Sequence, residues 1–204
     1  MAIVVVGGHT RNIGKTSVVA GIITALPQYH WTAFKITQYG HGLCTAHGEP
    51  CACETSTHTV AISEEHDATT GTDSARFLQA GAARSFWMRT RQGYLAEAMP
   101  RIRRELEHAE NAIFESNSVL RFLRPDLYLT VLNPSIADFK ASAQYFLDRA
   151  DAIVLTAPGT NVTSAWTETF FSRIRNKPTF LMSQPKFDCN DLSGWIAQRL
   201  PIHR

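Results

Sequence analysis

A short loop near the N-terminus constrains the fold of this chain more than any other feature of its sequence. Ile3-Val4-Val5-Val6 is an uninterrupted β-branched run that ends at Gly7-Gly8, which predicts a buried strand. The stretch from Thr16 to Leu26 is largely apolar and stops before Pro27, which predicts a helix. The loop between them therefore joins the carboxyl end of a strand to the amino end of a helix.

This loop has the spacing of a phosphate-binding loop with one residue added. The ordinary pattern is G-x-x-x-x-G-K-[ST], and here the first glycine, Gly8, stands one position further from Gly14-Lys15-Thr16. Backbone N–H groups in such a loop point at phosphate oxygens. Lys15 would reach the β- and γ-phosphates, and the Thr16 hydroxyl would ligate Mg²⁺. The alternative is a glycine-containing turn with an incidental Gly-Lys-Thr, and the flanking strand and helix argue against it. We expect a nucleoside triphosphate, ATP or GTP, to bind with Mg²⁺ at Gly8, Thr10, Arg11, Asn12, Ile13, Gly14, Lys15, Thr16 and Ser17.

Short apolar runs alternate with helix-like stretches along the rest of the chain. Strands are expected at 31–36, 59–63, 86–89, 112–115, 127–132, 152–156 and 179–182. Helices are expected at 73–80, 94–109, 137–150, 163–174 and 191–200, the first closed by Gly81. This alternation predicts an α/β fold, with a mostly parallel sheet covered by helices on both faces. We expect a single P-loop NTPase domain over residues 1–204.

The balance of charge and the absence of long apolar runs exclude several classes of partner. The 204 residues contain 20 Lys and Arg against 18 Asp and Glu, a formal charge of +2. That balance indicates neither nucleic acid nor an anionic membrane as a partner. No apolar run approaches the roughly 20 residues that a membrane helix needs, and Met1 to Val6 lacks the basic start of a signal peptide. We expect a cytoplasmic protein without a membrane partner.

Two acidic residues are candidates for the chemistry. Glu115 ends the apolar strand that starts at Ala112, where a Walker-B-type acid holds Mg²⁺ or its water. We expect it to act as metal ligand and catalytic acid; the alternative is a solvated charge at a strand end. Asp73 is expected to cap the helix it precedes, because Asp is a favoured N-cap residue. A catalytic role for Asp73 is the second choice.

The base of the nucleotide is not fixed by any motif. Asn176-Lys177-Pro178-Thr179 begins like the guanine-binding N-K-x-D but lacks its aspartate. The sequence therefore does not distinguish ATP from GTP as the ligand.

A cysteine- and histidine-rich segment lies within residues 37–72. Thiolate and imidazole are the ligand types of tetrahedral Zn²⁺, and three thiolates could hold part of an iron–sulfur cluster if Cys189 or a second subunit completed it. The alternative is an exposed loop with reduced thiols. The segment follows the carboxyl end of the second strand, on the side where open α/β sheets bind ligands. The candidate ligands for Zn²⁺ or an iron–sulfur cluster are His41, Cys44, His47, Cys51 and Cys53.

Two stretches resemble dethiobiotin synthetase and its relatives. In that family, too, five residues separate the first loop glycine from Gly-Lys-Thr, as they do between Gly8 and Gly14. Lys35-Ile36-Thr37-Gln38-Tyr39-Gly40 is similar to its K-P-x-x-T-G segment, with Lys35, Gln38 and Gly40 in matching places. The resemblance implies that Lys35 lies beside the phosphates as a second cation. Ile36 and Tyr39 replace the proline and threonine of that pattern.

A broader resemblance covers roughly the first 120 residues. The N-terminal strand and loop, the stretch from Asp73-Ser74 through Ala80-Gly81-Ala82, and Glu115 at a strand end resemble the molybdopterin-guanine dinucleotide biosynthesis protein B (MobB) family. The glycine that follows the strand acid in that family is replaced by Ser116. The resemblance implies a small α/β protein that binds GTP and forms a homodimer.

Three hypotheses about function follow. The first is an Mg²⁺-dependent NTPase similar to MobB, in which Lys15 and Thr16 hold the triphosphate and metal, Glu115 orients Mg²⁺ or water, and Lys35 offers charge to the transferred phosphoryl group. The second is an ATP-dependent carboxylate-activating ligase resembling dethiobiotin synthetase. The third is a metal-delivery or maturation factor whose nucleotide state gates the Cys/His segment. Each implies an unidentified second substrate or client protein.

Overall fold

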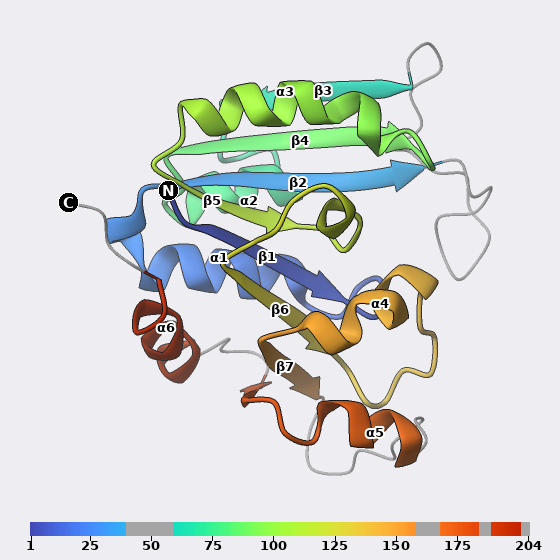
Figure 1. The fold of residues 1–204 in the computed structure, drawn as a ribbon. Helices are drawn as coiled ribbons and strands as arrows, with labels where there is room; N and C mark the ends of the chain where they lie inside the picture. The colour runs from blue at the N-terminus through green and yellow to red at the C-terminus, as the bar shows by residue number, and fades with distance from the viewer. Residues whose placement is uncertain (40–58, 158–167, 184–188, 201–204) are drawn as a thin grey trace.

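The computed structural model describes residues 1–39, 59–157, 168–183 and 189–200, and one sheet forms its centre (Figure 1). The strands are β1 Ile3–Gly8, β2 Trp31–Tyr39, β3 Val60–Glu65, β4 Arg84–Arg91, β5 Asn111–Glu115, β6 Leu127–Leu132, β7 Ala152–Ala157 and β8 Thr179–Ser183. Their order is β3-β4-β2-β5-β1-β6-β7-β8. Every neighbouring pair is parallel except β3 and β4. The predicted, mostly parallel α/β sheet is confirmed.

Helices cover both faces of this sheet. They are α1 Lys15–Ala25, α2 Asp73–Gln79, α3 Leu95–Glu107, α4 Ala141–Phe146, α5 Glu168–Ile174 and α6 Asn190–Ala197, with 3₁₀ turns at Pro27–Tyr29, Ser118–Arg121 and Leu147–Arg149. Figure 1 shows α1, α2 and α6 on one face and α3, α4 and α5 on the other. Within the described residues, no helix has the length and apolar character needed to cross a membrane.

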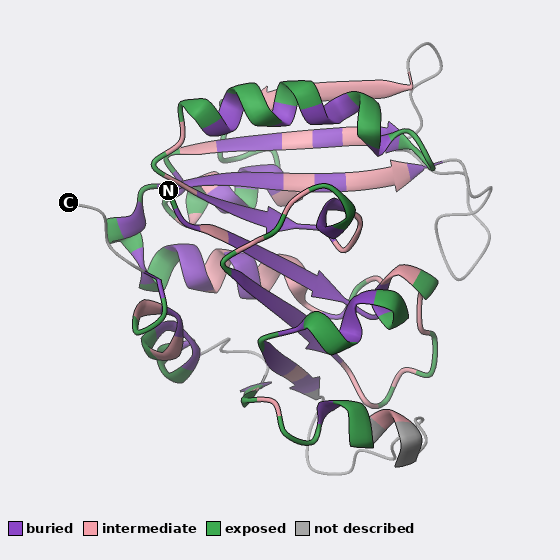
Figure 2. Cartoon of the chain, viewed as in Figure 1, coloured by how far each residue is buried: buried purple, intermediate pink, exposed green. Residues whose placement is uncertain are grey.

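Alternation along the strands builds two apolar cores. Val4 and Val6 of β1 face the core under α1, whereas Val5 between them faces the core under α3. In the second core the ring of Phe34 stacks between two others, 5.2 Å from Phe86 and 4.5 Å from Phe114 between centroids. Figure 2 shows the central strands almost wholly buried and β3, at the edge, only partly so. The strand ends at the centre of the sheet are therefore set by tight packing.

One predicted helix is wrong in its extent. The sequence indicated a helix over 137–150, but α4 begins only at Ala141 and gives way to the 3₁₀ turn that starts at Leu147. The preceding segment is held by tertiary contacts instead: the backbone N–H of Lys140 donates to the carbonyl of His9 at 2.8 Å, and Asp138 accepts from the Thr10 hydroxyl. These bonds tie the segment to the loop after β1.

Two strands extend further than predicted. β2 continues past Ile36 to Tyr39, and β4 runs from Arg84 to Arg91 instead of 86–89. Each strand is longer than predicted because the two strands pair with each other along almost their whole length, from Thr32–Arg84 to Tyr39–Arg91. The strand expected at 59–63 is present as β3, and Gly81 ends α2 with φ +102°, as predicted. The start of the helix expected at 163 lies outside the described residues.

The end of β1 closes against Asn117. The N–H of Gly8 donates to Asn117 Oδ1 at 2.9 Å, and Asn117 Nδ2 donates to the Gly8 carbonyl at 2.8 Å. A Cβ on Gly7 would lie 2.0 Å from Asn117 Oδ1 and 2.9 Å from the Tyr128 ring. The strand can approach this side chain only because residue 7 has no side chain. Glycine here fixes where the following loop begins.

Replacing Gly7 by alanine should therefore destabilise the protein. The new methyl group overpacks the contact with Asn117 and should lower the free energy of unfolding by about 1–3 kcal/mol. Gly194→Ala is the matched control, because a Cβ at this position in α6 meets nothing within 4 Å; it should raise the free energy by about 0.5–1 kcal/mol. Urea denaturation measures both. Equal urea denaturation midpoints for Gly7→Ala and the parent protein would show that Asn117 can move away from the new methyl group with no loss of stability.

Candidate functional site

The loop between β1 and α1 adopts a strained backbone that glycine and asparagine make accessible. Gly14, the N-cap of α1, has φ 91° and ψ 11°, and Asn12 has φ 54°. Both lie in the left-handed region, which costs little for glycine and is tolerated by asparagine. A Cβ on Gly8 would lie 2.8 Å from Lys15 Cδ, so the lysine stem passes directly over this glycine. The loop thus wraps closely around its own lysine.

Contacts from two other parts of the chain hold this loop. Thr156, on β7, donates its hydroxyl to the Ile13 carbonyl at 2.8 Å. On the other side, the Thr10 hydroxyl bonds to Asp138 and the carbonyl of His9 accepts from the backbone of Lys140. The loop is therefore fixed between β7 and the segment before α4, at the carboxyl edge of the sheet.

Lys15 is only partly exposed and has no acid partner within 4 Å among the described residues. Its ammonium donates to the carbonyl of Thr10, inside the same loop. The pKa of Lys15 is lowered to about 8, because burial penalises the charged form and Lys140 and Lys35 repel it, although Glu115 acts in the opposite direction. In this structure the positive charge of Lys15 is incompletely compensated.

Thr16, Lys35, Asp73 and Glu115 meet directly behind the loop. The Thr16 hydroxyl donates to Glu115 Oε2 at 2.8 Å, and Lys35 Nζ lies 2.5 Å from Glu115 Oε1 and 2.6 Å from Asp73 Oδ2. Lys35 and Glu115 are register partners on the neighbouring strands β2 and β5. The Glu115 side chain is only 3% exposed, so its charge needs these partners. Four elements of the fold converge on this group.

The charges in the group fix one another's protonation. Burial acts to lower the pKa of Lys35, but the charges of Glu115 and Asp73 outweigh it, so the pKa is raised. The pKa of Asp73 is lowered because the nearby Lys35 ammonium outweighs the effect of burial. Lys35 is therefore a permanent cation and Asp73 a permanent anion at neutral pH.

Asp73 is not the helix cap that the sequence suggested. Thr72 is the N-cap of α2, and its hydroxyl accepts from the N–H of Ala75 at 3.1 Å. Asp73 is the first residue of the helix and is left to pair with Lys35. Asp67 is exposed and bonds to Thr69 in its own turn, away from this group.

The oxygen atoms around Lys35 are the kind that Mg²⁺ prefers. A threonine hydroxyl and two carboxylates, from Thr16, Glu115 and Asp73, converge within 3.4 Å of one point, the Lys35 ammonium. Mg²⁺ takes such hard oxygen ligands, keeps several waters, and needs only one or two protein carboxylates when phosphates complete its shell. The types of donor fit Mg²⁺ bound together with a phosphate, and in this structure the Lys35 ammonium lies among them.

Ser17 and Cys189 do not join this group. Ser17 Oγ accepts from Arg76 Nη2 on α2 at 3.0 Å. Cys189 is buried in the core under α1 and α6. In the part of the chain that the structure describes, no cluster of His, Cys, Asp and Glu is suited to a metal ion. The candidates at His41, Cys44, His47, Cys51 and Cys53 lie outside the described residues.

The structure adds one cation that the sequence did not indicate. Lys140 lies just before α4 and faces the loop, where Arg11 and Lys35 repel it. Its pKa is lowered to about 8, first by burial and then by these cations, with Asp138 acting against them. Lys140 falls inside the helix predicted over 137–150, and the sequence offered no signal for its position beside the loop.

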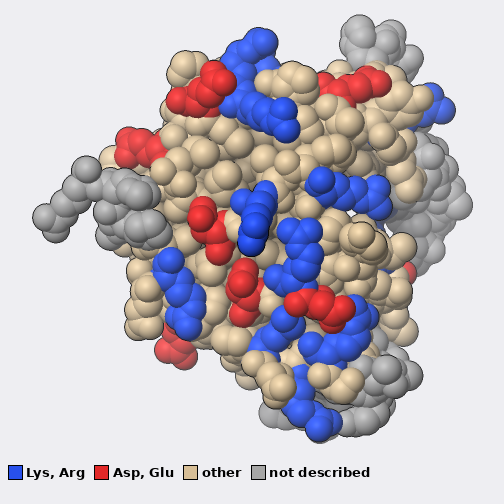
Figure 3. All heavy atoms as spheres, in the orientation of Figure 1, with Lys and Arg blue, Asp and Glu red and all other residues tan. Residues whose placement is uncertain are grey.

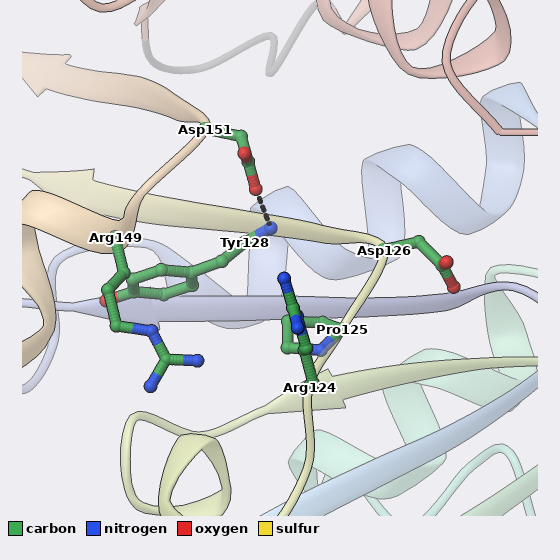
Figure 4. A pocket seen from close by; sticks show the side chains of 6 residues that line it. All are labelled: Arg124, Pro125, Asp126, Tyr128, Arg149 and Asp151. Carbon is green, nitrogen blue, oxygen red and sulfur yellow. Dashed lines mark hydrogen bonds between the residues drawn. The ribbon is translucent and has the colours of Figure 1, made fainter.

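A separate pocket lies at the opposite edge of the sheet. It has a volume of about 340 Å³ and lies at the amino ends of β6 and β7 (Figure 4). Its two carboxylates cap backbone groups: Asp126 accepts from the N–H of Ile3 and Asp151 from that of Tyr128, each at 2.7 Å. These acids serve the strand ends, and nothing connects this pocket to the loop.

Surface charge does not point to a single partner. On the face that carries α3 and α4, Lys and Arg side chains are interspersed with Asp and Glu (Figure 3). This mixture agrees with the formal charge of +2. The charge concentration that matters is local, around the loop.

Comparison with known proteins supports the fold alone. No protein-family model matches the chain, and no curated protein matches its sequence. A crystal structure of HypB from Helicobacter pylori in complex with nickel superposes with a TM-score of 0.54 and 14% identity, covering 100% of this chain and 91% of that one. A structure of LpxK from Aquifex aeolicus in complex with ATP has a TM-score of 0.49 and 17% identity over 89% of this chain and 54% of that one. With the loop between β1 and α1, the likeness to HypB shows that the chain has the P-loop NTPase fold.

Proposed function

We propose that this chain is an Mg²⁺-dependent P-loop protein that binds and hydrolyses ATP or GTP, similar to the MobB family. The observation that carries the proposal is the contact between Thr16 and Glu115 at 2.8 Å, directly after the loop lysine. A hydroxyl at the start of α1 and a carboxylate at the end of β5 are the two protein groups that a P-loop site uses to hold its metal. Here they meet in the expected P-loop fold.

The loop supplies the phosphate site. Its backbone N–H groups and the N-terminus of the eleven-residue α1 favour phosphate oxygens. Lys15 would exchange the Thr10 carbonyl for a phosphate oxygen, a stronger acceptor for a charged donor. Because Lys15 lacks an acid partner among the described residues, no ion pair has to be broken first.

Thr16 and Glu115, with Asp73 behind them, would hold Mg²⁺ against the β- and γ-phosphates. The bound metal would neutralise charge that develops on the phosphoryl oxygens. Lys35 lies among the same oxygens and keeps its proton, so it can stabilise the same charge from the protein side. Hydrolysis at such a site depends on positioning and electrostatics.

The ligase and metal-delivery hypotheses stand on the sequence alone. The contacts of the loop and of the group around Lys35 do not distinguish carboxylate activation from hydrolysis, and the Cys/His segment lies outside the described residues. The identity of the nucleotide base is also undetermined. Lys177, from the stretch that begins like the guanine-binding N-K-x-D, donates to the carbonyls of Asp148 and Ala150, away from the loop.

Lys15→Ala should weaken nucleotide binding. Removing one buried charged hydrogen bond to phosphate costs about 1.5–3 kcal/mol, which corresponds to about 10- to 100-fold in dissociation constant. Arg103→Ala, on the exposed face of α3, removes the same charge far from the loop and should bind as the parent does. Calorimetric titration with ATP and GTP in the presence of Mg²⁺ measures both. Equal affinity of Lys15→Ala and the parent would refute the proposal.

Glu115→Gln should uncouple nucleotide binding from Mg²⁺. The substitution keeps the shape of the side chain but removes the charge that holds the metal, so the gain in affinity on adding Mg²⁺ should fall about tenfold or more. Hydrolysis should fall with it. Glu107→Gln, exposed on α3, is the control. The test compares titrations with Mg²⁺ and with EDTA; an unchanged Mg²⁺ effect would remove Glu115 from the site.

Nucleotide binding should also take up protons above pH 8. The pKa of Lys15 is about 8 in the free protein, and phosphate would raise it toward the ordinary value of 10.5. Between these values the complex holds a proton that the free protein lacks. Affinity is therefore full below pH 8 and declines as pH rises above it. Calorimetry at pH 8.5 in two buffers of different ionisation enthalpy counts the protons. Lys15→Ala should reduce the uptake; identical heats in both buffers would contradict the shift.

A further inference from the structure

A second row of polar side chains lies beside the proposed nucleotide site. Lys35 pairs in register with Trp87 of β4, and Thr37 pairs with Arg89 two positions further toward the carboxyl edge. Because side chains alternate along a strand, these four residues share one face of the sheet. The same face carries Ser85, whose hydroxyl donates to the Ser74 carbonyl of α2 at 2.8 Å. Trp87 and Arg89 follow Ser85 two and four positions further along β4.

Arg89 is held in place by the indole beneath it. Its guanidinium carbon lies 4.6 Å from the centroid of the Trp87 ring. The indole N–H of Trp87 donates to the Thr37 hydroxyl at 3.1 Å, which fixes the ring across the two strands. A guanidinium stacked on a fixed aromatic ring is pre-organised, because the ring orients its plane.

This guanidinium has no hydrogen-bond acceptor and no acid partner among the described residues. Arg89 Nε is buried and makes no hydrogen bond, and no described carboxylate lies within 4 Å of the group. Arg84, on the same strand, shows the usual arrangement: it binds Glu64 at 2.7 Å and Glu105 at 3.0 Å. A buried donor without an acceptor is costly and uncommon. Arg89 is therefore arranged for an acceptor that the described part of the chain does not supply.

We propose that Arg89 binds the carboxylate or phosphate group of a second ligand, a small anionic molecule held beside the nucleotide. An arginine fork matches both groups in bidentate geometry. Arg89 and Lys35 are diagonal neighbours on adjacent strands, so roughly 7–8 Å separates their Cα atoms. The far end of a small molecule anchored by Arg89 would thus reach Lys35. Asp73, which also lies beside Lys35, is already paired with it at 2.6 Å.

This inference rests on the proposed function for the identity of the neighbouring nucleotide, but Arg89 can be tested apart from it. The probes are succinate and inorganic phosphate, titrated calorimetrically into two forms of the full chain. One is the parent protein saturated with Mg²⁺ and a non-hydrolysable ATP analogue, so that the loop is filled. The other is Lys15→Ala without nucleotide, in which the loop binds phosphate poorly.

Arg89→Ala is compared with Arg91→Ala in each form. Arg91 is the matched control, because it carries the same charge on the same strand and also lies over an aromatic ring, Tyr94, at 5.7 Å, but at an exposed position. We expect at least one probe to bind, with Arg89→Ala about tenfold or more weaker and Arg91→Ala within twofold of its parent. Binding of succinate alone assigns a carboxylate, and binding of phosphate alone assigns a phosphate group.

Arg89→Lys keeps the charge and removes the fork and the Nε donor. It should also bind the probe several-fold more weakly than the parent, and it replaces Arg89→Ala if that variant does not fold. The inference is overturned if neither probe binds the parent forms, or if the Arg89 and Arg91 variants bind equally. If ATP and GTP fail to bind the parent protein, the proposed function fails, while the titrations in Lys15→Ala still decide on Arg89.

Discussion

The burial of Glu115 is the constraint on which the rest of this structure depends. A carboxylate taken out of water is tolerated only with charged and hydrogen-bonding partners around it. Lys35 supplies the charge from β2, and Thr16 supplies the hydroxyl from the start of α1. Asp73 then balances Lys35 from the start of α2. One buried acid in this way fixes how two strands and two helices meet at the carboxyl edge. Such a pair is weak evidence for stability, but either partner alone would be an uncompensated charge.

The loop beside this group carries the opposite imbalance. Lys15 and Lys140 both have pKa values of about 8, lowered mainly by burial and further by neighbouring cations. The tight loop, with Gly14 at φ 91°, brings these charges together without an acid for each. A polyanion would relieve their repulsion, because its several charges can pair with both ammonium groups. The geometry and the electrostatics of the loop thus favour the same class of ligand, a nucleoside triphosphate.

Local signals in the sequence predicted the centre of the site, and tertiary contacts determined what it missed. The loop and Thr16 could be predicted because strand, glycine spacing and helix are adjacent along the chain, and Glu115 because it ends an apolar strand. Asp73 could not be assigned, because Asp and Thr are both good caps and only the position of Lys35 decides which one is free. The position of Lys140 beside the loop could not be predicted either. Its backbone hydrogen bond to His9 interrupts a segment whose composition is typical of a helix.

The pairing of the basic residues separates those that stabilise the fold from those available to a ligand. Arg84 and Arg173 each form two hydrogen bonds with a single carboxylate, Glu64 and Asp148 respectively, and they tie elements together. In the part of the chain described, Lys15, Lys140 and Arg89 have no acid within 4 Å, and all three lie toward the carboxyl edge of the sheet. Other arginines without an acid partner, such as Arg91 and Arg103, are exposed, whereas these three are partly buried. The formal charge of +2 conceals this separation, because it sums paired and unpaired groups alike. Function follows the distribution of unpaired charge, which only the fold determines.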